Sequence, residues 1–134
     1  MNESLIELVR RRADNACEYC LMPQAFYPVP FQIDHIVSRQ HAGLTLLANL
    51  ALSCLHCNSH KGPNIAGRDR ITKQLAALFN PRRHSWARHF RWRGPFFVGR
   101  TPIGRVTVAV LNMNGDFLVR LREELMNDGV LPAE

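Results

Sequence analysis

FQIDHIVSRQHAGLTLLANLALSCLHCNSHK, residues 31–61, is the stretch around which the remaining chain can be organised. An apolar run leads into Asp34-His35, and Asn49 follows 14 residues after His35. A carboxylate beside an imidazole, with an amide returned by the chain, can hold one hard cation next to a general base. The stretch therefore favours a metal-dependent phosphodiesterase centre.

The cysteines of the chain fall into two C-x-x-C pairs, Cys17 with Cys20 and Cys54 with Cys57. Two such pairs separated by a few dozen residues are the ligand pattern of a tetrahedral zinc site. A redox C-x-x-C of the thioredoxin kind needs only one pair and a βαβ context. Because four thiolates leave no open coordination position, the pattern predicts a structural zinc ion, which ties the N-terminal helix to the region of Asn58.

Short elements are predicted around these motifs. Phe31–Ile36 suggests a strand that carries the acidic and imidazole side chains near its end, and Leu50–Ser53 suggests a second strand after a loop at Gln40–Ala48. Leu55 to about Lys61 is typical of a short helix, which Gly62-Pro63 terminates. The expected order is strand, loop, strand and helix, with zinc knuckles at both ends.

The order of these motifs is similar to that of the zinc-bound branch of the HNH nuclease family. Over residues 10–62 it runs C-x-x-C, D-H-I-V, N-L and C-x-x-C-N-x-x-K-G, and Asn58 stands in the third motif position, as in the HNN variant. The resemblance implies an α+β protein with a ββα-metal finger, stapled by the four-cysteine zinc site and flanked by helical N-terminal and C-terminal extensions. It also implies a standalone bacterial or phage-type endonuclease that hydrolyses DNA with one divalent cation, magnesium or manganese.

The residue types support the same chemistry when they are considered without the family. His35 has a side chain whose ordinary pKa is about 6.5, which suits it to take a proton from water near neutral pH. Asp34 offers a hard oxygen ligand and Asn58 a neutral one, and waters and phosphate oxygens complete the octahedral shell of magnesium. Neighbours on a strand point to opposite sides, so Asp34 and His35 serve metal and water separately. We expect Asn49 to hold the loop backbone so that His35 is correctly aimed.

Nucleic-acid contacts are expected from basic side chains around this centre and in a later aromatic stretch: Lys61, Arg39, His60, Arg91 and Arg93. The role of His60 is open, because on the short helix it can contact phosphate, supplement the metal shell or simply be a polar residue at the edge of the site. His41 is expected to be an exposed loop residue.

The composition changes after Gly62-Pro63. Between Arg68 and Arg105 there are ten Lys or Arg residues and a single acidic residue, Asp69. Apolar residues at helical spacing predict a helix over Arg68–Phe79. The concentration of positive charge favours an anionic partner for this part of the chain.

Aromatic residues alternate with arginines in residues 81–105. Two interpretations are open. The rings can stack on bases in a nucleic-acid groove, or Trp86, Phe90 and Trp92 can cover the apolar face of the finger. We expect the rings to serve as core and the arginines to face DNA.

Two helices are predicted near the C-terminus. Thr101-Pro102 is typical of an N-cap followed by proline in the first turn, so a helix is expected to about Leu111. A strand competes there because β-branched residues are common in the run. Asp116–Asn127 is amphipathic and predicts a terminal helix. The W-x-x-H-F-x-W and G-x-T-P-x-G-R stretches resemble an extension of some standalone bacterial HNH proteins, which we expect to act as packing and substrate platform.

The N-terminal segment predicts a helix over Glu3–Ala16. Ser4 and Glu7 fit a capping box, and apolar residues between them and after them supply a stripe. The arginines at residues 10–12 stand in its second half, where they complement the helix dipole or contact phosphate.

The length of 134 residues suits one domain, with residues 1–66 as the zinc-stapled core and residues 67–134 as a basic, mostly helical extension. A net charge of +6 and a pI near 9.8 favour an anionic partner. No apolar run approaches the roughly 20 residues of a membrane span. The apolar residues of the N-terminus precede its basic cluster, the reverse of a secretory signal, so a cytoplasmic protein with no membrane partner is expected.

Three functions compete for this sequence. The first is a DNA endonuclease that nicks, the second a non-catalytic zinc-containing DNA-binding module, and the third an RNA-directed nuclease. The set of Asp34, His35, Asn49 and Asn58 argues against the second, because a pure binder has no use for a general base beside a metal ligand. We expect no small-molecule cofactor. A monomer is favoured over a homodimer because the sequence has no sustained heptad pattern.

Overall fold

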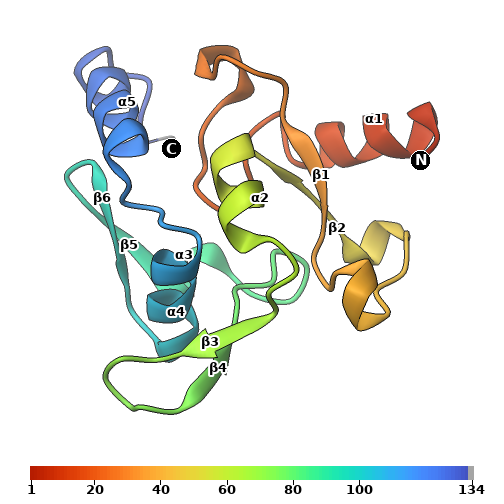
Figure 1. The fold of residues 1–134 in the computed structure, drawn as a ribbon. Helices are drawn as coiled ribbons and strands as arrows, with labels where there is room; N and C mark the ends of the chain where they lie inside the picture. The colour runs from red at the N-terminus through yellow and green to blue at the C-terminus, as the bar shows by residue number, and fades with distance from the viewer. Residues whose placement is uncertain (133–134) are drawn as a thin grey trace. The chain divides into compact units, whose positions relative to one another are not determined.

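The computed structural model describes residues 1–132, which form two compact units (Figure 1). The first unit contains residues 1–65 and Asn80–His84, and the second contains Ala66–Phe79 and the chain from Ser85 onward. Helices and short antiparallel strands occur together, which confirms the α+β class. The expectation of a single domain stays a prediction. Within the described residues, no helix is both long and apolar enough to cross a membrane.

The first unit begins with helix α1, Glu3–Arg12. Its N-cap is Asn2, whose Oδ1 accepts a hydrogen bond from the Leu5 amide over 2.8 Å. The capping box predicted at Ser4 is therefore wrong, because the cap lies two residues earlier. The helix also ends before the predicted Ala16, since Asp14 and Asn15 adopt positive φ angles of 52° and 55° and reverse the chain.

A ββα arrangement follows α1. Strand β1, Gln32–His35, pairs antiparallel with β2, Leu50–Ser53, and Asp34 lies opposite Ala51. Helix α2, Leu55–Lys61, packs on β1 and ends at a glycine with a φ of 51°. Every residue of β2 is buried, so this strand is the apolar centre of the unit. The predicted bounds of β2 and α2 are confirmed.

Ionic and backbone contacts close the outer edge of β2. Glu18 accepts hydrogen bonds from the Leu52 amide and from Arg82, which reaches it from the segment Asn80–His84. Arg12 donates to the carbonyls of Leu47 and Leu50 over 2.9 and 2.5 Å. Arg12 therefore binds the backbone at the start of β2 and just before it. This role was not among the two predicted for it, which were interaction with the helix dipole and contact with phosphate.

The second unit contains two hairpins and three helices. Strand β3, Ala66–Arg68, pairs with β4, Leu75–Ala77, and β5, Phe90–Arg93, pairs with β6, Phe96–Gly99. The helices are α3, Trp86–His89, α4, Pro102–Val110, and α5, Asp116–Asn127. Helix α4 packs against β3, β4 and β6, so it joins the two hairpins (Figure 1).

The helix predicted over Arg68–Phe79 is wrong, because these residues form the β3–β4 hairpin and its approach to α4. Gly67 lies so close to α4 that an added Cβ would come within 2.8 Å of Val106. The Phe79 amide donates to Thr107 Oγ1 over 2.8 Å. These contacts with a distant helix outweigh the local helical spacing.

The predicted helix after Thr101 is confirmed as α4. The Thr101 hydroxyl accepts from the Gly104 amide over 3.0 Å, and proline occupies the first turn. Gly104 lies against the His89 carbonyl, where an added Cβ would come within 1.9 Å of the oxygen. The terminal helix has the predicted bounds, Asp116–Asn127.

Aromatic rings form a cluster in the second unit, in which Phe90 and Phe97 are buried while Trp86 and Trp92 are half-buried. Trp86 packs against Phe90 and Phe97 with ring centroids 5.1 and 5.3 Å apart, and Trp92 lies 4.5 Å from Phe97. The guanidinium of the buried Arg122 lies 4.3 Å from the Phe97 ring and donates to the Pro95 carbonyl over 2.6 Å. These rings therefore pack against one another within their own unit.

Candidate active site and metal centre

The cysteine side chains converge in the first unit. The four Sγ atoms lie within 4.8 Å of one another, and all four residues are fully buried. Cys20 and Cys54 have their sulfur atoms 3.7 Å apart. Tetrahedral zinc with Zn–S distances of about 2.3 Å requires sulfur atoms about 3.8 Å apart. The donor set and its spacing fit a structural zinc ion.

Local backbone geometry prepares this cluster for a cation. Cys54 is the N-cap of α2, and its Sγ accepts from the Cys57 amide over 3.4 Å. Cys17 Sγ accepts from the Cys20 amide over 3.5 Å. Burial raises the pKa of Cys17, but hydrogen bonds from the other three thiols outweigh it and bring that pKa well below the ordinary value.

Asp34 lies on the face of β1 that meets α2, and it is only 5% exposed. Its Oδ2 accepts from the Tyr19 hydroxyl over 2.6 Å, and its Oδ1 accepts from Lys61 Nζ over 3.2 Å. Burial raises the pKa of Asp34, although Lys61 and Tyr19 act in the opposite direction. Burial and the adjacent carboxylate also raise the pKa of Tyr19 well above its ordinary value.

Lys61 does not occupy the position expected of a phosphate ligand. Its side chain is 1% exposed, and Nζ donates to the His35 carbonyl over 3.1 Å as well as to Asp34. An ammonium group that is enclosed in this way is not available to DNA, so the expected phosphate contact does not fit the structure. The physical reason is that the buried carboxylate requires a counter-ion.

Asn58 faces β1 from α2. Its Nδ2 donates to Gln32 Oε1 over 2.7 Å, and Gln32 lies two residues before Asp34, on the same face of the strand. Asp34 and Asn58 therefore belong to the two surfaces that meet between β1 and α2. A carboxylate has about four lone-pair sites, so two remain beside the bonds to Tyr19 and Lys61. A carboxylate oxygen and an amide oxygen are both ligand types that a hard cation such as magnesium accepts.

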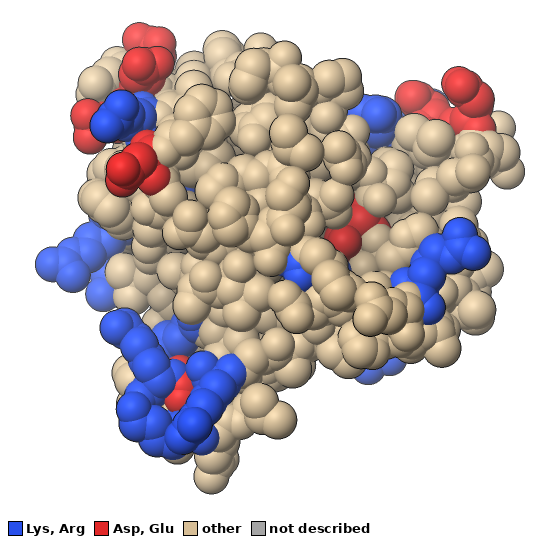
Figure 2. Space-filling model, viewed as in Figure 1, with Lys and Arg blue, Asp and Glu red and all other residues tan. Residues whose placement is uncertain are grey.

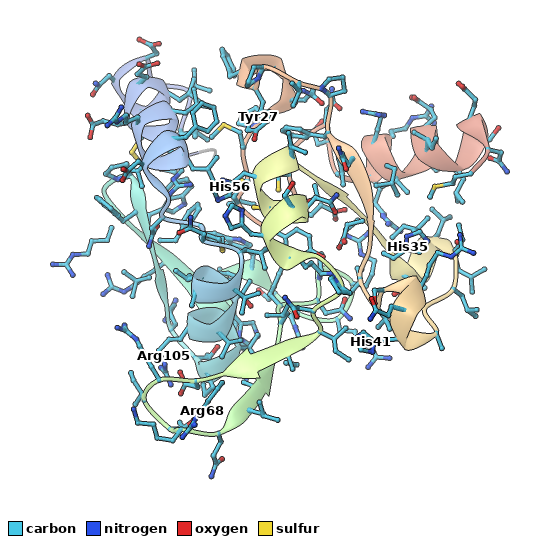
Figure 3. The ribbon with its side chains drawn as sticks, in the orientation of Figure 1. Tyr27, His35, His41, His56, Arg68 and Arg105 are labelled. Atoms are coloured by element: carbon cyan, nitrogen blue, oxygen red, sulfur yellow. The ribbon has the colours of Figure 1, made fainter. Side chains whose placement is uncertain are left out.

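His35 lies at the end of β1 (Figure 3). Its Nε2 lies 2.9 Å from Thr45 Oγ1, and its side chain is half-buried. Alternation along the strand turns it away from the side of Asp34. Nε2 is therefore in contact with a hydroxyl, and Nδ1 is the ring nitrogen that could take part in a reaction.

Asn49 makes the loop contacts that were expected of it. Its Oδ1 accepts from the Val37 amide over 2.8 Å, and its Nδ2 donates to the carbonyls of Val37 and Leu44 over 2.9 Å each. The loop between the strands is closed by these bonds directly after His35. The side chain therefore braces the backbone next to the imidazole.

The other residues that were expected to contact nucleic acid are exposed. His60 stacks on His56 with ring centroids 4.2 Å apart, and its Nδ1 lies 2.8 Å from the His56 carbonyl. Arg39 is exposed in the short turn Arg39–His41, as is His41 itself. In the second unit, Arg91 and Arg93 both lie exposed on β5.

Three residues of the site were not anticipated from the sequence: Tyr19, Gln32 and Thr45. Tyr19 lies between Cys17 and Cys20 and is buried. A buried tyrosine hydroxyl requires a polar partner, and this requirement could have indicated from the sequence that Tyr19 contacts a polar side chain. Gln32 precedes Asp34 by two residues, and strand alternation places both on one face. No local pattern marks Thr45, which comes to His35 through the fold of the loop.

Residues 17–64 match the family model described as HNH endonuclease. The match contains the cysteine cluster and all four motif positions, and it confirms the resemblance that the motif order indicated. No curated protein and no solved structure matches the chain. Over residues 17–64 the chain is thus similar to HNH endonuclease domains, a family whose members are generally nucleases.

Proposed function

We propose that this protein is a metal-dependent endonuclease that hydrolyses DNA phosphodiester bonds, with its centre in the HNH segment. The observation that carries the proposal is the position of His35. It stands beside a loop that Asn49 holds through three hydrogen bonds, while the acidic Asp34 faces the other side of the strand. A base and a metal ligand that are separated in this way can serve water and phosphate at the same time.

His35 is the general base in this mechanism. His35 Nε2 lies 2.9 Å from Thr45 Oγ1. In the proposed tautomer Nε2 carries the proton and donates to this hydroxyl, so that Nδ1 accepts a proton from the attacking water. Thr45 and Asn49 do not touch the substrate. They position the imidazole, one through its ring and the other through the loop backbone.

Asp34 and Asn58 would hold the divalent cation, magnesium or manganese. When bound, the cation neutralises charge on the phosphoryl oxygens and stabilises the departing 3′ oxygen. Because Lys61 already balances the charge of Asp34, these residues would hold such a cation only weakly, and water molecules would supply its remaining ligands. The cysteine cluster takes zinc and has no part in the reaction, because its four ligands leave no open position.

DNA is the proposed substrate. Arg39 and His60 are exposed in the HNH segment, and Arg91 and Arg93 are exposed on β5. A net charge of +6 gives the chain a general attraction for a polyanion. These residues supply sequence-independent contacts to phosphates, while the reaction itself depends on the HNH segment.

Incubation with nucleic acid and defined cations tests this function. Zinc-loaded protein should nick supercoiled DNA when magnesium or manganese is supplied and leave it intact when neither ion is present. Structured RNA of similar charge should be left intact under the same conditions. Retention of plasmid without nicking in any divalent cation would instead identify a binding module, and hydrolysis of RNA alone would identify an RNA-directed nuclease.

A further inference from the structure

The connection between β3 and β4 in the second unit carries a compact group of exposed cations. Arg68, Arg70 and Lys73 are all exposed, within a seven-residue segment that reads RDRITKQ from residue 68 to residue 74. Figure 2 shows Lys and Arg side chains gathered over the position of this hairpin in Figure 1, around an acidic side chain. The segment lies outside residues 17–64, which match the HNH family.

The acidic residue of the segment 68–74 is Asp69, and it does not cancel the charge of this group. It is 1% exposed, and Arg105 of α4 binds it through two nitrogen atoms, over 2.8 and 2.9 Å. The Arg105 guanidinium holds the pKa of that carboxyl well below its usual value. In the part of the chain that the structure describes, no carboxylate pairs with Arg68, Arg70 or Lys73. Three positive charges therefore face solvent without internal neutralisation.

The same aspartate fixes the shape of the connection. Its Oδ2 accepts from the Thr72 amide over 2.9 Å, and its backbone bonds to Gln74 and Lys73 over 2.9 and 2.8 Å. Lys73 has a φ of 64°, and its carbonyl accepts from Arg68 Nε over 3.1 Å. The cations are thus presented on a turn that is already ordered, which lowers the entropic cost of binding a partner.

Apolar side chains stand exposed beside these cations. Ile71 is 62% exposed at the turn, and Leu75 is 79% exposed at the start of β4. Isolated apolar residues on a surface need no explanation. Here, however, they share the end of a two-stranded ribbon with three unpaired cations. The major groove of B-DNA admits such a ribbon and offers thymine methyl groups between rows of phosphates.

We propose that the end of the β3–β4 hairpin binds duplex DNA through its major groove. Arg70 and Lys73 contact phosphates on the two sides of the groove, with Arg68 beside them. Ile71 packs against the base edges. Asp69 and Arg105 do not touch the DNA, and they hold the turn in shape. The inference rests on the proposed function only for the identity of the partner.

The test compares two matched single variants of the full, zinc-loaded chain. Arg70→Gln removes a cation from the hairpin end, and Arg120→Gln removes one from the exposed face of α5 in the same unit. Affinity for a short fluorescent duplex is measured by anisotropy without divalent cations, over a range of salt concentrations. Loss of one phosphate contact should weaken binding about 5-fold at 0.15 M salt and reduce the salt slope by about 0.9. Arg120→Gln should change neither.

Ile71→Ser supplies the second arm. It should weaken binding and leave the salt slope unchanged, because it removes an apolar contact and no charge. The exposed position of each substituted residue predicts unchanged melting temperatures. If Arg70→Gln binds no more weakly than Arg120→Gln, the inference is wrong, and magnesium-dependent cleavage by the parent protein then still supports the proposed function. If the parent protein neither binds nor cleaves DNA, both fail.

Discussion

Asp34 and Lys61 form a buried ion pair within the candidate active site, and Tyr19 completes the bonds of the carboxylate. Such a pair adds little net stability over apolar residues of similar size, but removal of one partner leaves a buried charge and costs about 3–5 kcal/mol. If Asp34 holds the proposed cation, the ion pair would compete with it, because the carboxylate already has a positive neighbour. The proposal therefore predicts that stability and metal affinity are coupled at this residue.

Lys61→Met should reveal that coupling. We expect a lower melting temperature, because the Asp34 carboxylate loses its counter-ion. Manganese should then raise the melting temperature of the variant more than that of the parent, since the cation replaces the missing ammonium. Lys73→Met is the control, because it makes the same change at an exposed lysine. An equal response of parent and variant to manganese would show that the cation does not bind at Asp34.

His35→Ala should lower the single-turnover cleavage rate by roughly 10²-fold or more, as expected for loss of a positioned general base. DNA affinity should stay the same, because binding depends on arginine and phosphate. Anisotropy and single-turnover rates measure the two effects separately. A parallel fall of binding and cleavage would make His35 a structural residue.

Thr45 is expected to act through His35. Thr45→Val removes the hydroxyl that lies 2.9 Å from Nε2 and should lower the rate less than His35→Ala does. Thr45→Ser restores the hydroxyl and should recover most of the lost rate. If serine does not restore the rate, the contact has no part in aiming the imidazole.

At the scale of elements, the sequence predicts those structures whose determinants are local. Three elements form with the predicted bounds, because their apolar patterns and their terminal residues indicate the same structure. They are β2, Leu50–Ser53, α2, Leu55–Lys61, and α5, Asp116–Asn127. The β3–β4 hairpin could not be predicted in this way. Its turn depends on Arg105, which binds Asp69 from α4, 36 positions later in the chain.

In the candidate site, too, some features follow from the local sequence and others depend on the fold. The brace by Asn49 and the opposite faces of Asp34 and His35 follow from motif spacing and strand alternation. The burial of Lys61 does not follow from any spacing. It depends on a carboxylate that the fold removes from water and that must then find a cation.

The four-cysteine cluster should contain one zinc ion per chain. Folding should require this ion, because the free energy of metal binding to four thiolates contributes to the free energy of folding. Cys54→Ser should therefore lose zinc and melt at a lower temperature than the parent. Elemental analysis and thermal unfolding measure these two effects. Absence of zinc from the parent protein, or an unchanged melting temperature in the variant, would contradict the assignment.

The Asp69–Arg105 pair predicts a pH dependence of stability. Because Arg105 lowers the folded-state pKa of Asp69, the carboxylate stabilises the fold above its unfolded pKa of about 3.9. That contribution should be lost as the pH falls through the folded-state pKa. The free-energy difference between the parent and Asp69→Asn should therefore be constant from pH 7 to about pH 5 and shrink below about pH 4. A difference that does not depend on pH would contradict this.

At the scale of the whole molecule, the motif positions occur once in the chain, so each monomer carries one proposed hydrolytic centre. The terminal helix is the remaining candidate for dimer formation. Its Leu118 and Leu125 are buried within the chain, and Leu121 is half-buried. The apolar face of this helix is therefore already occupied. We expect light scattering to give the mass of one chain, and a mass of two chains at low concentration would contradict this.

The most direct test of the central claim is the time course of supercoiled plasmid with magnesium. The parent protein and Asp34→Ala are loaded with zinc in the same way and compared at equal concentration. One centre at Asp34 and His35 predicts that open circles accumulate well before linear DNA, and that Asp34→Ala produces neither. Nicking by Asp34→Ala at the rate of the parent, or direct appearance of linear DNA at low enzyme concentration, would contradict the account.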